Sequence, residues 1–341
     1  MPLGPVGPPQ LVAAAGTPSA GAPSAPASIT LEPGDPNKKE RTIHGAAVLA
    51  QLSYENDAET VRSTLKALGF EDVKLYGWDL KGSTQAFVAR KGDTVVVSFR
   101  GTQERGDIFR DLEATNPEAD TKLTGSEVQD YARFEGSKVH RGFRDGLAEL
   151  WDPDPHGRNG ERLAAAGQKS LLSTLQYEAD RPDRPNTKFI FTGHSLGGAQ
   201  ATLAAACTSV QNPARSSRTT MANKIAAVIT FGSPKVGNEA FVSAYDASIG
   251  KVTMPVQHNT DIVRGVPLTS RYQQVMASDT IVFDPADTAN PPSAIDSHRM
   301  SHYVAASALR AQAEAARAGA ATPPAATVHA AAGYSTHDGF A

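Results

Sequence analysis

The segment TKFIFTGHSLGGAQATLAAA, residues 187–206, constrains the fold of this 341-residue chain most strongly. Its apolar first part ends at Gly193, and a run rich in alanine begins after Gly198. This order predicts a buried strand followed directly by a helix, with Ser195 on the sharp turn between them. Glycines two residues before and after the serine suit such a turn, because a Cβ at either position would collide where strand and helix pack closely.

Other apolar runs predict the rest of an α/β sheet. Strand-like runs occupy residues 72–78, 84–91, 93–101, 187–193, 225–233 and 252–259. Helical spacing of apolar residues occurs at residues 44–55 and 58–70, and at about 161–177, 198–210 and 238–247. Strands in succession followed by strand–helix alternation predict a mostly parallel central sheet with an antiparallel start, flanked by helices.

Composition separates the two ends of the chain from its middle. Nine of the 23 prolines fall within residues 1–36, among Ala, Gly and Ser. Such a segment buries too little apolar surface to offset the entropy of ordering it, so residues 1–38 are predicted to be disordered. The Ala-rich residues 319–341 show no amphipathic period and are predicted to form a disordered tail. Residues 39–318 are then expected to form one domain.

Charge and hydropathy exclude several kinds of partner. A formal net charge of −3 gives no general attraction to nucleic acid. No apolar run reaches the roughly 18–20 residues that span a bilayer, so no transmembrane segment is expected. Residues 1–31 carry no charged side chain, so the basic start of a secretory signal peptide is absent. The chain is expected to be soluble, either in the cytoplasm or exported by a non-classical or specialised route.

The predicted turn at Ser195 has two interpretations. A glycine-rich turn can contain a serine with no chemical role, and the pentapeptide GHSLG alone is weakly specific. The setting favours a nucleophile, because the free N–H groups at the start of a helix stabilise negative charge that develops beside them. A serine nucleophile also needs a histidine base and an acid that orients the base.

Five segments of the chain occur in the order of a known family. They are VVSFRGT (96–102), VHRGF (139–143), GHSLGGA (193–199), ITFGSPKVGNEAF (229–241) and NTDIVRGVP (259–267). Together they resemble the lipase class 3 family of α/β-hydrolases, of the fungal lipase type. The resemblance covers roughly residues 45–310 and neither terminal segment. It implies an α/β-hydrolase fold with a short lid or cap segment over the active site.

The resemblance also implies roles for individual residues. Ser195 matches the nucleophile of the family. Thr102 matches its oxyanion-hole residue, and the N–H of Leu196 is expected to be the second donor. Asp261 lies in the kind of segment that carries the acid of the family, whereas Asp246 and Asp284 lie in less suitable contexts.

The base has two candidates near the C-terminal end of the domain. His298 and His302 both follow Asp261, which preserves the order Ser, acid, His of α/β-hydrolases. On a helix these two histidines would share one face. A base on a loop before the helix reaches over the serine more readily, which favours His298. The side chain of His194 is expected to point away into the sheet packing.

Residues 102–138 occupy the position of the lid in the family. Ile108, Phe109 and Leu112 would line one face of a short helix there. This apolar strip is small, so it suits a gate for a soluble or short-chain ester as well as one for a triglyceride. An amphipathic surface helix without a gating role is the alternative.

The sequence therefore predicts a serine hydrolase that cleaves carboxylic esters of lipids through an acyl-enzyme, as an acylglycerol lipase or a phospholipase A1. It is expected to touch lipid surfaces transiently. The alternatives are a non-lipid carboxylesterase such as a feruloyl esterase, and a translocated bacterial effector that acts on host or competitor lipids. No cofactor or metal is expected, because the sequence contains no zinc spacing, phosphate loop or dinucleotide fingerprint.

Overall fold

The computed structural model describes the chain in segments that include its whole central sheet. The described residues are 28–78, 84–102, 118–120, 134–152, 158–165, 167–211, 220–258, 261–284 and 296–319. Most of the two terminal segments that were predicted to be disordered lies outside these residues. The lid candidates Ile108, Phe109 and Leu112 also lie outside them.

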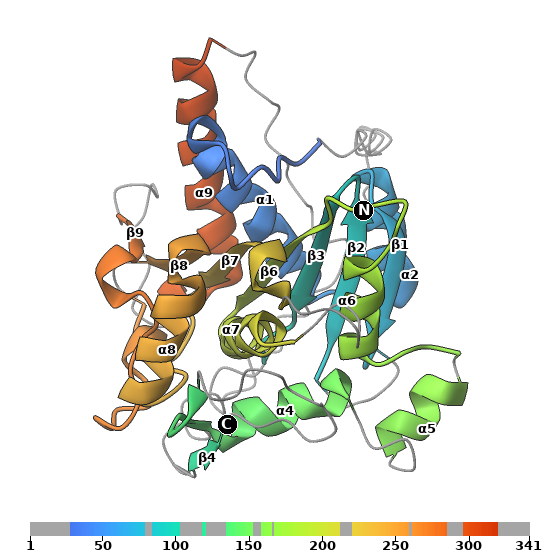
Figure 1. The fold of residues 1–341 in the computed structure, drawn as a ribbon. Coiled ribbons are helices and arrows are strands. Elements are labelled where there is room, and N and C mark those ends of the chain that lie inside the picture. Colours follow the sequence, from blue (N-terminus) through green and yellow to red (C-terminus); the bar gives the residue numbers. More distant parts are fainter. Residues whose placement is uncertain are drawn as a thin grey trace, which may run out of the picture.

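A seven-stranded sheet runs through the described part of the chain (Figure 1). In spatial order its strands are β1 (Glu71–Tyr76), β2 (Ala86–Lys91), β3 (Thr94–Phe99), β6 (Lys188–His194), β7 (Ile225–Phe231), β8 (Thr253–His258) and β9 (Ile281–Phe283). The pairs β1–β2 and β2–β3 are antiparallel, and the other pairs are parallel. The predicted mostly parallel sheet with an antiparallel start is confirmed. A separate antiparallel pair joins β4 (Glu118–Asp120) to β5 (Lys138–His140).

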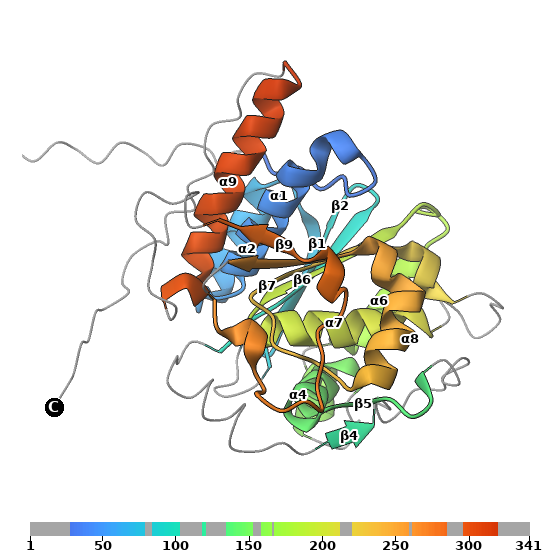
Figure 2. The ribbon, with the colours of Figure 1, turned by 90° about the vertical axis from the view of Figure 1, so that its left-hand side faces the viewer.

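Helices cover both faces of this sheet. The α-helices of the described residues are α1 (Lys39–Leu52), α2 (Ala58–Ala67), α4 (Arg141–Trp151), α5 (Arg158–Ala165), α6 (Leu171–Ala179), α7 (Leu196–Ser209), α8 (Glu239–Ile249) and α9 (Met300–Arg317). Short 3-10 helices are η1 (Pro36–Lys38), η3 (Met221–Lys224), η4 (Gly250–Val252), η5 (Val263–Gly265), η6 (Ala277–Asp279) and η8 (Asp296–His298). Figure 2 shows α1 and α9 on one side of the sheet and α7 and α4 on the other.

The central strands are buried on both faces, which explains their nearly continuous apolar sequence. In β3, Val95 and Val97 pack in the core on the α7 side, whereas Val96 packs in the core on the α1 side. In β6, Phe191 faces α7 and Ile190 faces α1 in the same way. This alternation fixes which side each residue at the end of β6 points to.

The N-terminal boundary of the domain lies earlier than predicted. Ile29 and Leu31 are buried in the same core as α1. Lys91 Nζ donates a hydrogen bond of 3.2 Å to the carbonyl oxygen of Ile29. The domain therefore includes residues 28–38, which the sequence analysis assigned to the disordered segment.

The single helix predicted over residues 161–177 is two helices, α5 and α6. Gly167 between them has a left-handed backbone with φ of 62°, which does not continue a helix. The hydroxyl of Ser170 accepts a hydrogen bond from the N–H of Ser173 and so caps the start of α6. The sequence analysis did not predict β9, which is too short for a periodic pattern, or α4, whose Phe143 and Leu147 are buried.

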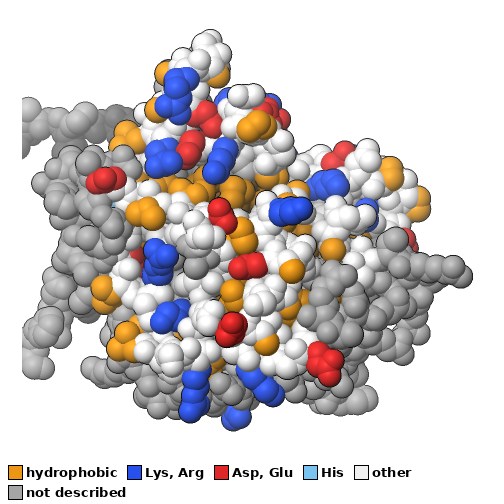
Figure 3. Space-filling model, turned by 60° about the vertical axis from the view of Figure 1, so that its left-hand side comes forward, with side chains coloured by type: hydrophobic (Ala, Val, Ile, Leu, Met, Phe, Trp, Pro, Cys, Tyr) orange, Lys and Arg blue, Asp and Glu red, His pale blue; other side chains and the backbone are white. Residues whose placement is uncertain are grey.

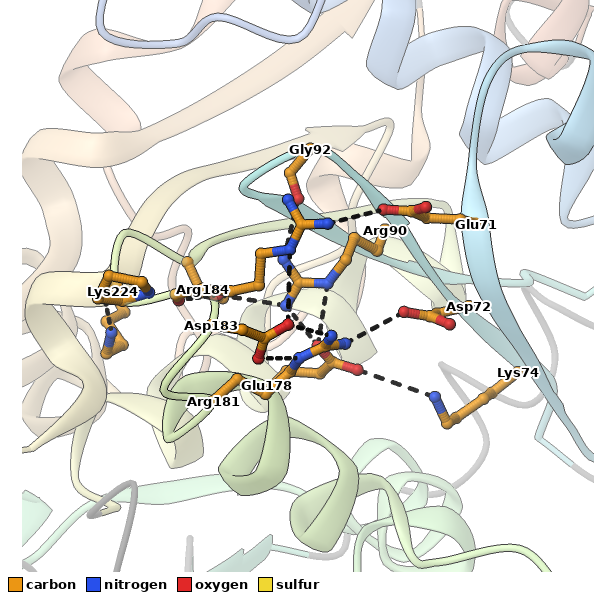
Figure 4. A network of polar contacts seen from close by, with 12 residues as sticks. Glu71, Asp72, Lys74, Arg90, Gly92, Glu178, Arg181, Asp183, Arg184 and Lys224 are labelled. Atoms are coloured by element: carbon orange, nitrogen blue, oxygen red, sulfur yellow. Dashed lines mark hydrogen bonds and ion pairs between the residues drawn. The ribbon is translucent and has the colours of Figure 1, made fainter.

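A buried ion pair joins the sheet to α6 (Figure 4). Arg90 in β2 donates to Glu178 in α6, and their side chains are 1% and 2% exposed. Lys74 and Arg181 each lie 3.8 Å from the carboxylate of Glu178, and Arg181 continues the network to Asp72 at the surface. Loss of Glu178 would leave the buried guanidinium of Arg90 without its carboxylate, so this contact fixes α6 beside the antiparallel edge of the sheet.

The surface carries charges of both signs. On the face shown in Figure 3, basic and acidic side chains of the described residues are interspersed, with hydrophobic side chains between them. This distribution agrees with the small net charge of the chain. Within the described residues, no helix has the length and hydropathy to cross a bilayer.

Candidate active site

Ser195 lies on a strained turn between β6 and α7. Its backbone has φ of 57° and ψ of −129°, a conformation that L residues rarely adopt and that costs about 1–3 kcal/mol. The turn is tight: a Cβ at Gly193 would lie 2.2 Å from the carbonyl oxygen of Gly197, and a Cβ at Gly197 would lie 2.3 Å from that of Phe99. The steric reason that the sequence analysis gave for these glycines is confirmed.

Ser195, His298 and Asp261 form one chain of hydrogen bonds. The Nε2 atom of His298 lies 2.8 Å from Ser195 Oγ, and its Nδ1 atom lies 2.8 Å from Asp261 Oδ2. All three residues are buried. An ionised carboxylate only accepts, so Nδ1 of His298 carries a proton and Nε2 is free to accept the serine hydroxyl. The structure thus brings together three side chains that lie far apart in the sequence.

The carboxylate of Asp261 is held by more than the histidine. The hydroxyl of Tyr303 in α9 donates to Oδ2 at 2.5 Å, and the N–H of Val263 donates to Oδ1 at 2.8 Å. Burial alone would raise the pKa of the Asp261 carboxyl. The hydrogen bond and electrostatic interaction with His298, together with the hydrogen bonds from Tyr303 and Val263, outweigh burial and lower this pKa. Asp261 is therefore ionised at neutral pH.

Tyr303 is a site residue that the sequence analysis missed. Its hydroxyl also accepts a hydrogen bond of 3.0 Å from the N–H of His258. Burial and the nearby charge of Asp261 raise the pKa of Tyr303 well above its ordinary value, so it remains a donor. Its position in the segment HRMSHY, five residues after His298, was visible in the sequence, but nothing in the sequence shows that this hydroxyl reaches Asp261.

Gly232 packs directly against the side chains of Asp261 and His298. It follows β7 and has φ of 52°. A Cβ there would lie 2.6 Å from Asp261 Oδ2 and 3.0 Å from His298 Nδ1. A side chain of any size at this position would therefore displace the pair.

The other acid and base candidates lie elsewhere. His302 lies in α9 and is half-buried, with its ring centroid 6.4 Å from that of His258. Asp246 in α8 accepts a hydrogen bond from the N–H of Met276. Asp284 follows β9 directly. Of the two histidines, His298 in η8 is the one whose ring lies within hydrogen-bond distance of Ser195 Oγ.

The two candidate oxyanion donors lie in different elements. Thr102 is exposed and follows β3, whose end packs against Gly197 of the turn. Leu196 is the first residue of α7, where a backbone N–H has no partner within the helix. One candidate thus lies three residues after the end of a neighbouring strand, and the other lies directly after the serine.

Replacement of Tyr303 by Phe should reveal how strongly the carboxylate of Asp261 depends on this hydroxyl. A hydrogen bond to a charged group stabilises a fold by about 1.5–3 kcal/mol, so urea unfolding at pH 7 should show a loss of that size. This loss of unfolding free energy should become smaller as the pH is lowered. Because the Tyr303 bond lowers the pKa of Asp261 in the folded state, its contribution is present above the unfolded value of about 3.9 and disappears as Asp261 protonates.

Tyr245→Phe is the matched control for this experiment. The hydroxyl of Tyr245 is also buried, but its partner is the neutral hydroxyl of Thr253 at 3.0 Å. Its loss should therefore cost about 0.5–1.5 kcal/mol at every pH. An equally small and pH-independent loss in Tyr303→Phe would contradict the role assigned to its hydroxyl.

The chain is similar in sequence to proteins of known function. A lipase of Rhizopus niveus is 30% identical over 190 residues, which cover 55% of this chain and 39% of that protein. Phospholipase A1-II 1 of Oryza sativa subsp. indica is 27% identical over 199 residues, which cover 56% of this chain and 46% of that protein. The chain thus matches less than half the length of these two relatives.

The fold is similar to that of a solved lipase. The nonglycosylated LIP2 lipase of Yarrowia lipolytica superposes with a TM-score of 0.54 at 21% identity, covering 76% of this chain and 83% of that one. This likeness, with the mostly parallel sheet between helices, shows the predicted α/β-hydrolase fold. The sequence pattern of the family described as lipase (class 3) matches residues 96–270, just over half of the chain. The chain therefore belongs to the class 3 lipase family.

Proposed function

We propose that this chain is a serine hydrolase that cleaves a carboxylic ester of a lipid. The observation that carries the proposal is the continuous chain of hydrogen bonds from Ser195 through His298 to Asp261. This arrangement performs nucleophilic acyl transfer in unrelated folds, so its geometry supports the reaction independently of the family.

In the first step, Ser195 Oγ attacks the carbonyl carbon of the ester while His298 Nε2 takes the hydroxyl proton. Asp261 stabilises the imidazolium that forms. The carbonyl oxygen becomes an oxyanion, for which the N–H of Leu196 and the N–H and hydroxyl of Thr102 are the proposed donors. One such donor contributes about 10²–10³-fold in kcat.

In the second step, the tetrahedral intermediate collapses. The C–O bond to the alcohol breaks, and His298 returns its proton to the leaving oxygen, which leaves the acyl group on Ser195. Water then attacks this acyl-enzyme while His298 takes one of its protons. The bond between the acyl carbon and Ser195 Oγ breaks, His298 returns the proton to Oγ, and the carboxylic acid is released. The imidazole of His298 accepts and returns the proton in both steps, so no further titratable group is required.

The relatives support a lipid as the source of the ester. Lipase and phospholipase A1 are names of enzymes that both cleave a carboxylic ester of a lipid, and this shared chemistry favours an acylglycerol or a glycerophospholipid over an aryl ester. The fold and the hydrogen-bonded site are common to all these activities, so the choice between them depends on the substrate pocket.

An ester panel tests this function. The full chain should be assayed on a triacylglycerol emulsion, phospholipid vesicles, a monoacylglycerol, short aryl esters and a feruloyl ester, with Ser195→Ala as the blank. We expect hydrolysis of at least one lipid ester at a higher kcat/KM than of the feruloyl ester. A folded wild-type protein that hydrolyses no lipid ester above the blank would contradict the proposal.

A further inference from the structure

A second chain of hydrogen bonds lies directly behind the proposed catalytic residues. His194 ends β6, and the alternation of that strand turns its ring to the α1 side of the sheet. The ring is buried there, with its centroid 4.5 Å from that of His298. Its Nε2 atom lies 2.7 Å from the carbonyl oxygen of His298, and its Nδ1 atom lies 2.7 Å from the hydroxyl of Tyr54.

The direction of these hydrogen bonds is fixed. A carbonyl oxygen only accepts, so Nε2 of His194 carries the proton and donates to His298. In a neutral imidazole the other nitrogen then accepts, and the hydroxyl of Tyr54 is its donor. Burial, together with the neighbouring imidazole of His298, lowers the pKa of His194 to about 3, so the ring is neutral at pH 7. His194 is therefore no second base.

The same tyrosine contacts the segment that leads to the proposed oxyanion donor. Tyr54 follows α1, and a Cβ on Gly101 would lie 2.2 Å from its hydroxyl and 2.5 Å from the carbonyl oxygen of His194. The guanidinium of Arg100 lies 5.9 Å from the centroid of the Tyr54 ring. Tyr54 thus contacts the backbone of Gly101, the residue before Thr102. Its hydroxyl is also hydrogen-bonded to His194, which in turn is hydrogen-bonded to the carbonyl oxygen of His298.

The segment that carries His298 needs such support. It is η8 (Asp296–His298), a single 3-10 turn, and α9 begins only at Met300. A turn of this length has few backbone hydrogen bonds of its own. A donor on the carbonyl of His298 therefore restrains the peptide next to the imidazole, which must stay within hydrogen-bond distance of Ser195.

We propose that Tyr54 and His194 form a positioning relay that holds the backbone of His298 in register with Ser195. The relay extends from Tyr54, just after α1, through the last residue of β6 to His298, and it packs against Gly101, the residue before Thr102. Neither side chain touches a reacting atom, so both are positioning residues. The proposal rests on the proposed hydrolase function, which it deepens.

Substitutions along the relay test it through kcat. Tyr54→Phe removes only a hydroxyl and should lower kcat by about 10-fold with an unchanged KM, as expected for one hydrogen bond. His194→Phe removes the whole relay and should lower kcat by about 10²-fold, the cost of a small misplacement of the base. Because both residues act in one relay, the double variant should be no slower than His194→Phe. His194→Gln keeps an N–H donor and should recover part of the loss.

A matched control distinguishes an effect on the position of His298 from a general loss of folding stability. Tyr76 is a fully buried tyrosine in β1 whose hydroxyl donates to Thr174 at 2.8 Å. Tyr76→Phe should lower stability like Tyr54→Phe but leave kcat unchanged. Wild-type kcat in His194→Phe, or a double variant in which the two losses multiply, would overturn the relay.

Hydrogen–deuterium exchange tests the same relay without turnover. Release of the carbonyl of His298 should speed exchange over residues 296–300 in Tyr54→Phe and His194→Phe, and not in Tyr76→Phe. This measurement does not depend on turnover, so it tests the relay even if the wild-type protein hydrolyses no ester and the proposed function fails. Exchange over residues 296–300 at the wild-type rate in both relay variants would overturn the relay.

Discussion

Ser195→Ala is expected to lower kcat/KM for ester hydrolysis by about 10⁶-fold, the effect of removing the nucleophile from a hydrogen-bonded triad. Without the hydroxyl, no acyl-enzyme forms, and His298 is left with no group to deprotonate except water. The fold should be retained, because the substitution removes one buried oxygen and leaves the glycines of the turn in place. Steady-state hydrolysis of the best ester from the panel measures the loss.

Ser209→Ala is the control for the nucleophile variant. Ser209 is also fully buried and lies at the opposite end of the same helix, α7, where its hydroxyl donates to the carbonyl of Ala206 at 2.7 Å. It should keep wild-type kcat/KM. Ester hydrolysis by Ser195→Ala at more than a small fraction of the wild-type rate would mean that another group is the nucleophile.

Gly232→Ala is expected to lower kcat/KM by at least about 10²-fold, because displacement of a catalytic group by 1 Å costs that much. The added Cβ would lie 2.6 Å from Asp261 Oδ2, closer than a real contact allows, so Asp261 and His298 would have to move. The left-handed backbone at this position adds strain for any L side chain, about 1–2 kcal/mol. Kinetics and urea unfolding should be measured on the same preparation.

Gly92→Ala isolates the backbone part of this effect. Gly92 has a similar φ of 59°, in the turn between β2 and β3, but a Cβ there meets nothing within 4 Å. It should lose about 1–2 kcal/mol of stability with unchanged kcat/KM. Equal kinetic constants in the two glycine variants would show that the contact at Gly232 does not matter for catalysis.

The strongest local patterns in the sequence predicted those parts of the fold that depend only on residues close together in the chain. The apolar strand before Ser195 and the alanine-rich helix after it allow one sharp turn, and the glycines at 193 and 197 are there for the predicted steric reason. The nearly continuous β-branched run of β3 is typical of a strand buried on both faces. These features need no knowledge of distant contacts.

Long-range contacts could not be predicted in the same way. The sequence showed two histidines, His298 and His302, at a spacing that a helix would place on one face. In the structure α9 begins at Met300, so that His302 is in the helix and His298 is before it. The contacts of Gly232 and Tyr303 with Asp261 depend on how β7 and α9 pack around the same carboxylate. No local pattern encodes that packing.

His194 illustrates how a correct local prediction can be incomplete. Its side chain does point away from Ser195 Oγ, as strand alternation requires. The side of the sheet to which it points also holds η8, so its ring meets the carbonyl of His298. At the N-terminal boundary the local prediction was wrong. The proline-rich composition predicted disorder, but the core buries two apolar residues of this segment, Ile29 and Leu31.

The most direct test of the central claim is covalent labelling by a fluorophosphonate probe, followed by peptide mapping. An activated serine displaces fluoride and forms an Oγ–P bond, whereas an ordinary hydroxyl does not react. We expect one label, on the peptide that contains Ser195, with a rate that falls at least about 10³-fold in His298→Ala. Labelling of another residue, or an equal rate in His298→Ala, would contradict the claim that this imidazole activates this hydroxyl.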